Sequence, residues 1–226
     1  TENITEIARI GFTLEQSMAI GSAGARFAIA SGDKIEGVTD SLGKVILALD
    51  LMDISEQKVT EITDKMQTVL LRTPLSTQTL SEGMRHASSS MAVFTQNSDR
   101  IGKDLENYKD EVLTTTLALE GAFSRIGRTG SQSGLHIREM YTKLIAMDKA
   151  AKAMFDQNTL GLYFDEATKQ VNRAGIGMKI SAENLSSFAE KDLPKAIELL
   201  SKLYVKGEIT SNTLKKIFTE RLNYVA

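Results

Sequence analysis

The sequence has no cysteine and no tryptophan, and its 226 residues include only two prolines and two histidines. The absence of cysteine excludes disulfide bonds, thiolate metal ligands and cysteine nucleophiles. A zinc site needs several converging ligands, and His86 and His136 each lie inside a helical pattern with no cysteine to assist them. His86 follows Arg85 and is interpreted as a surface residue. We therefore predict neither a bound metal ion nor another cofactor.

Long apolar runs and blocks of like charge are also missing. No apolar stretch approaches the ~20 residues that a membrane-spanning helix needs, so no transmembrane segment is predicted. The formal net charge is -2 at pH 7 and both signs are mixed along the chain, which argues against a nucleic-acid-binding surface. The sequence starts with neither a signal-peptide pattern nor an initiator methionine, which predicts a fragment of a longer chain.

Most of the sequence has apolar residues at the spacing of an α-helix. Apolar residues recur at intervals of three and four along almost the whole chain, as they do on the buried face of a helix. Short links between these runs suit antiparallel neighbours. The sequence predicts an all-α fold, a multi-helix antiparallel bundle or array, in one domain over residues 1–226 with a subdivision near residue 158 left open. The runs include Ile35, Val38, Leu42, Val45 and Leu49; Leu80, Met84, Ala87, Met91 and Phe94; and Val112, Leu119, Phe123 and Ile126.

One segment departs from this spacing. Residues 175–180 are broken by glycine and mildly alternating, and four polar or small residues follow them. Alternation is the pattern of a half-buried strand. One short β-hairpin near residues 176–187 is therefore left open within the all-α prediction.

Local signals for helix ends agree with the spacing. Capping-box patterns, in which side chains satisfy the first free backbone N–H groups, occur at Thr13–Gln16, Asp33–Glu36 and Asp53–Glu56. Asp192 can cap a helix that has Pro194 in its first turn, where a missing N–H costs nothing. Glycines stand where the periodic runs end, at Gly11, Gly32, Gly127 and Gly207.

The most conspicuous local feature is residues 127–134, which read Gly-Arg-Thr-Gly-Ser-Gln-Ser-Gly. Glycine-rich turns before helices can bind phosphate, but this one lacks the Lys-Ser/Thr ending of a P-loop and no strand precedes it. No serine stands at the centre of a Gly-x-Ser-x-Gly nucleophile elbow. We predict an inter-helix loop with a geometric role, in which Ser131 or Ser133 caps the next helix. The structural residues of this motif are Gly127, Gly130, Ser131, Gly134 and Arg138.

Acidic residues do not form a recognisable catalytic pair. Asp104, Glu106, Asp110 and Glu111 are predicted on one helix beside Lys103 and Lys109, as on a solvated face with helical ion pairs. A glycosidase would need two acids across a cleft with differently tuned pKa values. We find no isolated acid in an apolar setting and predict that the chain is not an enzyme.

Residues 122–127 read Ala-Phe-Ser-Arg-Ile-Gly, residues 130–134 read Gly-Ser-Gln-Ser-Gly, and residues 135–144 read Leu-His-Ile-Arg-Glu-Met-Tyr-Thr-Lys-Leu. This order resembles the bacteriophage tail tape measure family, in which a glycine-punctuated loop leads through small residues and a glycine to a helix with an arginine and a bulky apolar face. The family more often has alanine at Ser133 and threonine at Leu135.

The flanking sequence is similar in the same order. Residues 62–66 and 75–84 resemble the paired upstream helices of the family, and residues 174–176 resemble its turn after the arginine helix. Residues 192–197 and 217–221 resemble its last two helices. The chain departs from the family at Thr219, where glycine is usual, and near residues 181–184, where the common Asp-x-x-Gly turn is replaced.

The resemblance implies a structural and morphogenetic component of a phage or prophage tail, with a role in tail-length determination and tail assembly. It implies tail tube subunits and tail assembly chaperones as partners, with self-association left open. It also implies a location in the virion after assembly in the host cytoplasm. The residues alone leave an alternative, a non-catalytic helical interaction module of a bacterial secreted or surface protein.

Overall fold

A computed structural model describes residues 2–49, 51, 54–96 and 105–218. Over this part of the chain it contains eleven helices and three short strands and is 74% helical, which confirms the all-α prediction. The helices are α1 (Glu2–Arg9), α2 (Leu14–Ser31), α3 (Ile35–Ala48), α4 (Glu56–Arg72), α5 (Thr77–Gln96), α6 (Leu105–Arg125), α7 (Ser131–Ile145), α8 (Lys149–Asn158), α9 (Ala182–Lys191), α10 (Leu193–Val205) and α11 (Ser211–Phe218). The strands are β1 (Tyr163–Asp165), β2 (Gln170–Asn172) and β3 (Met178–Lys179).

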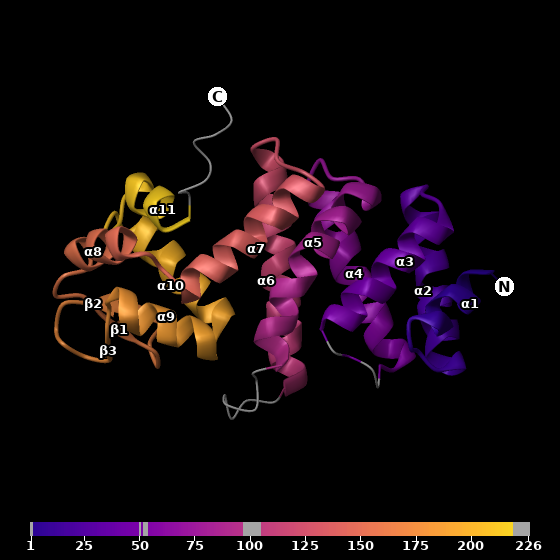
Figure 1. Cartoon of the computed structure of the whole chain (residues 1–226), viewed down its shortest axis with the longest axis horizontal. Coiled ribbons are helices and arrows are strands. Elements are labelled where there is room, and N and C mark those ends of the chain that lie inside the picture. The colour runs from indigo at the N-terminus through magenta and orange to yellow at the C-terminus, as the bar shows by residue number, and fades with distance from the viewer. Residues whose placement is uncertain (1, 50, 52–53, 97–104, 219–226) are drawn as a thin grey trace. The chain divides into compact units, whose positions relative to one another are not determined.

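The chain divides into two compact units, and the division falls between Arg138 and Glu139, inside α7. The sequence analysis treated residues 1–226 as one domain and left a subdivision open near residue 158, which is the last residue of α8. The colours of Figure 1 follow residue number, so each helix can be assigned to its unit by its colour. The two units are described separately below.

The first unit holds α1 to α6 and the start of α7. Within it, α2 packs against α1, α3 and α4, and α5 packs against α3 and α6. Each central helix contributes at least one completely buried side chain to the core, for example Ile20, Leu42, Ile62 and Met84. One-sided apolar faces that bury each other in this way explain why the three/four spacing is so regular here.

The second unit combines short helices with a small sheet. Helix α8 packs against α9 and α11, and α9 packs against α10. The sheet has the antiparallel order β2-β1-β3, with Phe164 opposite Val171 on one side and Met178 on the other. Phe164 is buried and its ring lies 6.1 Å from that of Phe188 on α9, which attaches the sheet to the helices.

The β element lies earlier in the chain than residues 176–187. Its hairpin is β1–β2, closed by a turn in which Asp165 accepts hydrogen bonds from the N–H of Ala167 and the hydroxyl of Thr168. Only β3 falls inside the expected range. The residues that follow it begin α9 instead, because Ser181 accepts a hydrogen bond from the N–H of Asn184 and caps that helix.

Most helix-end predictions are confirmed. Thr13 and Gln16 form a capping box on α2, and Asp192 caps α10 with Pro194 in its first turn. The Asp33 prediction is wrong, because Lys34 occupies the N-cap of α3 and the Asp33 N–H bonds the Ala28 carbonyl at the end of α2. Ser55 caps α4, and Asp53 lies outside the described residues. Positive φ angles confirm the helix-ending glycines at Gly11, Gly32, Gly127 and Gly207.

Candidate functional site

The glycine-rich segment joins α6 to α7, but it is shorter as a loop than expected. Residues 126–130 form the connection, and Ser131 to Gly134 already belong to the first turn of α7. Gly130 precedes the helix with a φ of 61°, a left-handed conformation that favours glycine. Since α7 begins at Ser131, neither Ser131 nor Ser133 is its N-cap.

Two glycines bring α5 and α7 into close backbone contact. A Cβ atom on Gly134 would lie 2.1 Å from the carbonyl oxygen of Gly83, a separation that real Cβ atoms do not adopt. A Cβ atom on Gly83 would lie 2.4 Å from Oε1 of Glu120 on α6. The absence of a side chain at Gly83 therefore makes the space that the Glu120 carboxyl group fills, and three helices meet at this point.

Glu120 is completely buried at this junction of α5, α6 and α7. The Ser133 hydroxyl lies 2.5 Å from its Oε2, whereas Oε1 has no hydrogen-bond partner within the described chain. Burial disfavours the charged form and raises the pKa of Glu120 to about 7, although the Ser133 hydrogen bond acts in the opposite direction. The sequence analysis found no isolated acid in an apolar setting and so did not anticipate the burial of Glu120.

The hydrogen bonds around Ser133 fit a neutral Glu120. The Ser133 hydroxyl has one hydrogen, and its oxygen lies 2.5 Å from Oε2 of Glu120 and 2.8 Å from the Gly130 carbonyl. If the carboxyl group is protonated, it can donate to Ser133 while Ser133 donates to Gly130, with one hydrogen for each contact. An ionised carboxylate would compete with the Gly130 carbonyl for the single hydroxyl hydrogen.

A carboxyl group with a pKa near 7 has the acidity of a general acid. Catalysis also needs contact with a substrate, and the Glu120 side chain has no exposed surface. What the geometry can do is join α6 to the first turn of α7 through Ser133. The chemistry is that of a buried polar contact between helices.

The sequence could have indicated Glu120, because it continues a buried face at intervals of four from Val112 through Thr116. The predicted face of α6 was placed wrongly. It used Val112, which is buried, but continued through Leu119 and Phe123, which are half-buried, to Ile126, which is 70% exposed. Acidic residues are rarely fully buried, so the residue type favoured a solvent-exposed position for Glu120.

Two other motif residues, Ser131 and Arg138, lie on the surface of α7, whereas Gly127 lies in the loop before it. Ser131 and Arg138 are exposed, so they do not join the buried junction. His136 is half-buried and its ring lies 5.6 Å from that of Phe123 on α6. Nowhere in the described ranges do three metal-ligating side chains gather into a site for an ion.

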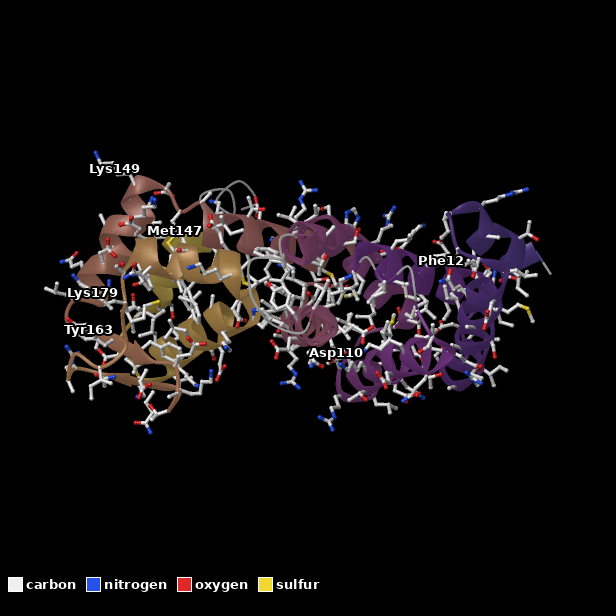
Figure 2. All side chains as sticks on the ribbon, turned by 90° about the horizontal axis from the view of Figure 1, so that it is seen from below. Phe12, Asp110, Met147, Lys149, Tyr163 and Lys179 are labelled. Carbon is white, nitrogen blue, oxygen red and sulfur yellow. The ribbon has the colours of Figure 1, made fainter. Side chains whose placement is uncertain are left out.

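The acidic residues of α6 do not form a uniform solvated face. Asp110 (Figure 2) forms ion pairs with Lys65 and, at 3.4 Å, with Lys58, both on α4. Partial burial alone would raise the pKa of Asp110, but the hydrogen bond and charge of Lys65, helped by Lys58, lower it. Lys109 is buried rather than solvated. Asp104 and Lys103 lie outside the described residues.

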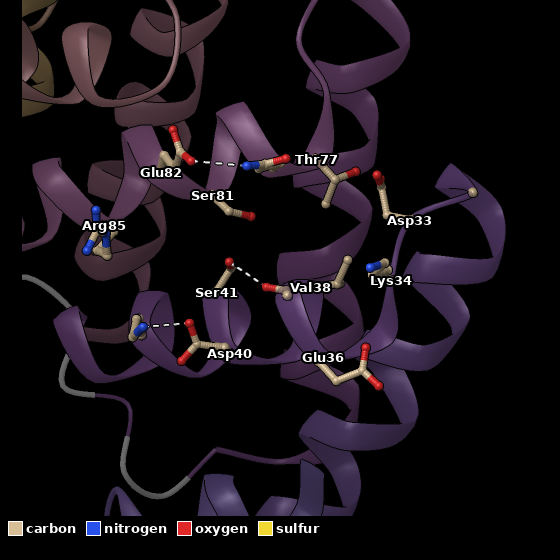
Figure 3. A pocket seen from close by; sticks show the side chains of 14 residues that line it. Asp33, Lys34, Glu36, Val38, Asp40, Ser41, Thr77, Ser81, Glu82 and Arg85 are labelled. Carbon is tan, nitrogen blue, oxygen red and sulfur yellow. Dashed lines mark hydrogen bonds and ion pairs between the residues drawn. The ribbon is translucent and has the colours of Figure 1, made fainter.

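A cleft of about 680 Å³ lies between the α2–α3 connection, α3 and α5 (Figure 3). Most of its lining residues have polar side chains, and these carry both signs of charge. Within it Lys44 pairs with Asp40 at 2.5 Å, and Gln78 donates to Glu82 at 3.3 Å. The sequence analysis did not predict this cleft, because its two walls come from separate helices.

No protein-family model, curated protein or solved structure matches the chain. No helix in the described part of the chain has the length and apolar character to cross a membrane. The likeness to the tape measure family therefore depends on the sequence motifs quoted above alone.

Proposed function

We propose that the chain is a segment of a phage tail tape measure protein, a structural and morphogenetic component of the tail. The observation that carries the proposal is the ordered glycine motif over residues 122–144, which forms the end of α6, a tight turn and α7. Close glycine packing against α5 gives that motif a geometric role, which is what a structural protein requires of it.

The proposed role is non-catalytic. Glu120, the acid with the most strongly raised pKa among the described groups, is enclosed between helices and serves their packing. Tail tube subunits and tail assembly chaperones are the proposed partners, and self-association is compatible with the same role. The proposed location is the tail of the virion, after assembly in the host cytoplasm.

Mass spectrometry of purified tails tests the location. Peptides from residues 1–226 should be recovered from intact tails, and an in-frame deletion of the segment should impair tail assembly. Their absence from tails, together with recovery from a secreted or cell-surface fraction, would instead favour a bacterial helical interaction module.

An in-frame duplication tests how the segment contributes to length. A single helix of 226 residues would extend about 340 Å at 1.5 Å per residue. Because the helices fold back into compact units, the duplication should lengthen the tail by much less than that. An increase close to the full helical length would show that the segment acts as an extended ruler.

A further inference from the structure

Helix α2 has large apolar side chains on its solvent side as well as on its buried side. It packs against α1, α3 and α4, and Ile20 and Phe27 are among its buried residues. On its solvent side, three large apolar residues are more than half exposed: Leu14 at 67%, Met18 at 55% and Ile29 at 79%. A helix at the surface of a protein normally has polar residues on that side. The exposed side of α2 therefore requires an explanation.

The exposed residues form one stripe along the helix. Four apolar side chains fall within an arc of about 60° around the helix axis, counted at about 100° per residue: Leu14, Ala25, Met18 and Ile29. Ser22 lies beside them, and we call these five residues the α2 stripe. Because Ser22 and Ala25 are small, the middle of the stripe allows another helix to come close. Continuous exposed apolar surface of this kind commonly marks an interaction site.

One edge of the α2 stripe carries the two charged residues of the helix, Glu15 and Arg26. They lie about 20° apart around the axis but near opposite ends of the helix. Within the described chain Glu15 forms no ion pair, and Arg26 has only long contacts with α4, 3.6 Å to Glu56 and 3.4 Å to Thr60. An acid and a base on the same edge match each other when a second copy of the helix runs in the opposite direction.

We propose that α2 pairs with α2 of a second copy of this chain, in antiparallel orientation, through the α2 stripe. A two-fold axis at the middle of the stripe places Leu14 opposite Ile29 of the second copy. It also places Glu15 within about 3 Å, measured along the helix axis, of the level of Arg26 of the second copy. The symmetry repeats this charge pair at the other end. A parallel pair would bring different edges together and lose the match.

The size of the stripe sets the expected strength of the dimer. Stable interfaces use about 20–30 residues and about 800 Å² on each partner, which is more than the α2 stripe provides. We therefore expect a weak dimer with a Kd of about 10–100 μM. The inference concerns the chain alone and does not depend on the proposed role in phage tails.

Sedimentation equilibrium of the full chain, between about 1 and 500 μM, tests for the dimer. The mass should rise with concentration from 24.7 kDa toward twice that value. Met18→Lys and Ile29→Lys should keep the protein monomeric over this range, since a lysine charge is costly to bury in an apolar contact. Both variants should melt near the parent temperature, because both positions are exposed. The matched control is Leu71→Lys on α4, which is 79% exposed outside the stripe and should dimerise as the parent does.

Exchange of the two charges tests whether they pair between copies. Glu15→Arg alone and Arg26→Glu alone should each raise the Kd about threefold to tenfold in low salt, because like charges then meet at both ends. An equal mixture of the two variants should restore the parent affinity, because in the mixed dimer each arginine meets a glutamate. If the mixture dimerises no better than the single variants, the proposed charge pairs do not form.

Single cysteines test the direction of pairing, since the chain has none of its own. Ser22 lies next to the two-fold axis, so Ser22→Cys should give a disulfide-linked dimer on oxidation. The two copies of Leu14 should lie about 22 Å apart, too far for a disulfide, so Leu14→Cys should not crosslink by itself. A mixture of Leu14→Cys and Ile29→Cys should crosslink.

Three results would overturn the inference. The first is a parent protein that stays monomeric at the highest concentration, which would mean that another segment of the chain or a different partner covers the α2 stripe. The second is a Met18→Lys variant that dimerises as the parent does. The third is a Leu14→Cys variant that crosslinks as readily as Ser22→Cys, which would mean that the helices run parallel.

Discussion

Helix α6 carries two acidic side chains in opposite surroundings. Asp110 lies near two lysines of α4 and is 28% exposed at its side chain, whereas Glu120 lies between two glycine-containing helices with no exposed surface. The pKa of Asp110 is lowered and that of Glu120 is raised. The same functional group thus stays charged near one end of the helix and is mostly neutral below pH 7 near the other, because burial desolvates Glu120 while cations lie beside Asp110.

Of the changes that test this comparison, opening the contact between Gly134 and Gly83 should lower the free energy of unfolding most. Gly134→Ala places a Cβ atom 2.1 Å from the Gly83 carbonyl oxygen, so α5 and α7 must separate and expose the Glu120 site. We expect a loss of about 3 kcal/mol in the free energy of unfolding, measured in urea.

The matched control is Gly37→Ala on α3, where an added Cβ would meet nothing within 4 Å in the described structure. Since alanine favours helix over glycine, this variant should gain about 0.5–1 kcal/mol. If Gly134→Ala proves as stable as the parent, the close α5–α7 contact does not exist in solution.

The protonation of Glu120 should make the protein less stable as pH rises. Its folded pKa of about 7 exceeds the ordinary value of 4.5, so the folded state binds the proton more tightly than the unfolded state. Stability should therefore fall between pH 4.5 and about 7, by about 3 kcal/mol in total, and level off above that range. Urea unfolding at pH 5 and 8, followed by hydrogen exchange of the α6 amides, measures the change.

Glu120→Gln should remove this pH dependence, because its amide can donate to Ser133 at every pH. Glu15→Gln, at an exposed position on α2, should leave the dependence unchanged. A parent protein and a Glu120→Gln variant with the same pH profile would mean that Glu120 is not buried as a neutral acid.

The smallest of these losses of stability should come from Asp110→Asn, and its pH trend should have the opposite sign. The lowered pKa of Asp110 means that its ion pairs stabilise the protein above the ordinary pKa of 3.8 and lose that effect as pH falls below it. At neutral pH we expect a loss of about 1 kcal/mol, since the group is partly exposed, and a smaller loss in high salt. Equal losses at neutral pH and at a pH below the ordinary pKa would contradict the assignment.

The sequence predicted the helices well because their apolar spacing and caps are local. It predicted the capping box at Thr13 and the N-cap of α10 at Asp192 for the same reason. The contact of Gly134 with Gly83 could not be found in this way, since it joins distant segments through the absence of side chains. Glu120 was missed because its type suggested solvent while its spacing indicated the core.

The buried hydroxyls of Thr77 and Ser81, which have no hydrogen-bond partner within the described residues, show the same limit. Nothing in their local sequence distinguishes them from the many helical serines and threonines whose hydroxyls bond a preceding carbonyl. The cleft that these two residues line, between α3 and α5, becomes visible only when both helices are in place.

The boundary between the two units falls within α7, so the chain passes from one unit to the other through a hydrogen-bonded helix. A protease needs an extended stretch of backbone, and here it must first unwind several turns of helix. Limited proteolysis should therefore spare the Arg138–Glu139 bond until the part of the first unit that contains Gly134 has unfolded. The rate of cleavage at that bond would therefore measure how stably α7 is packed.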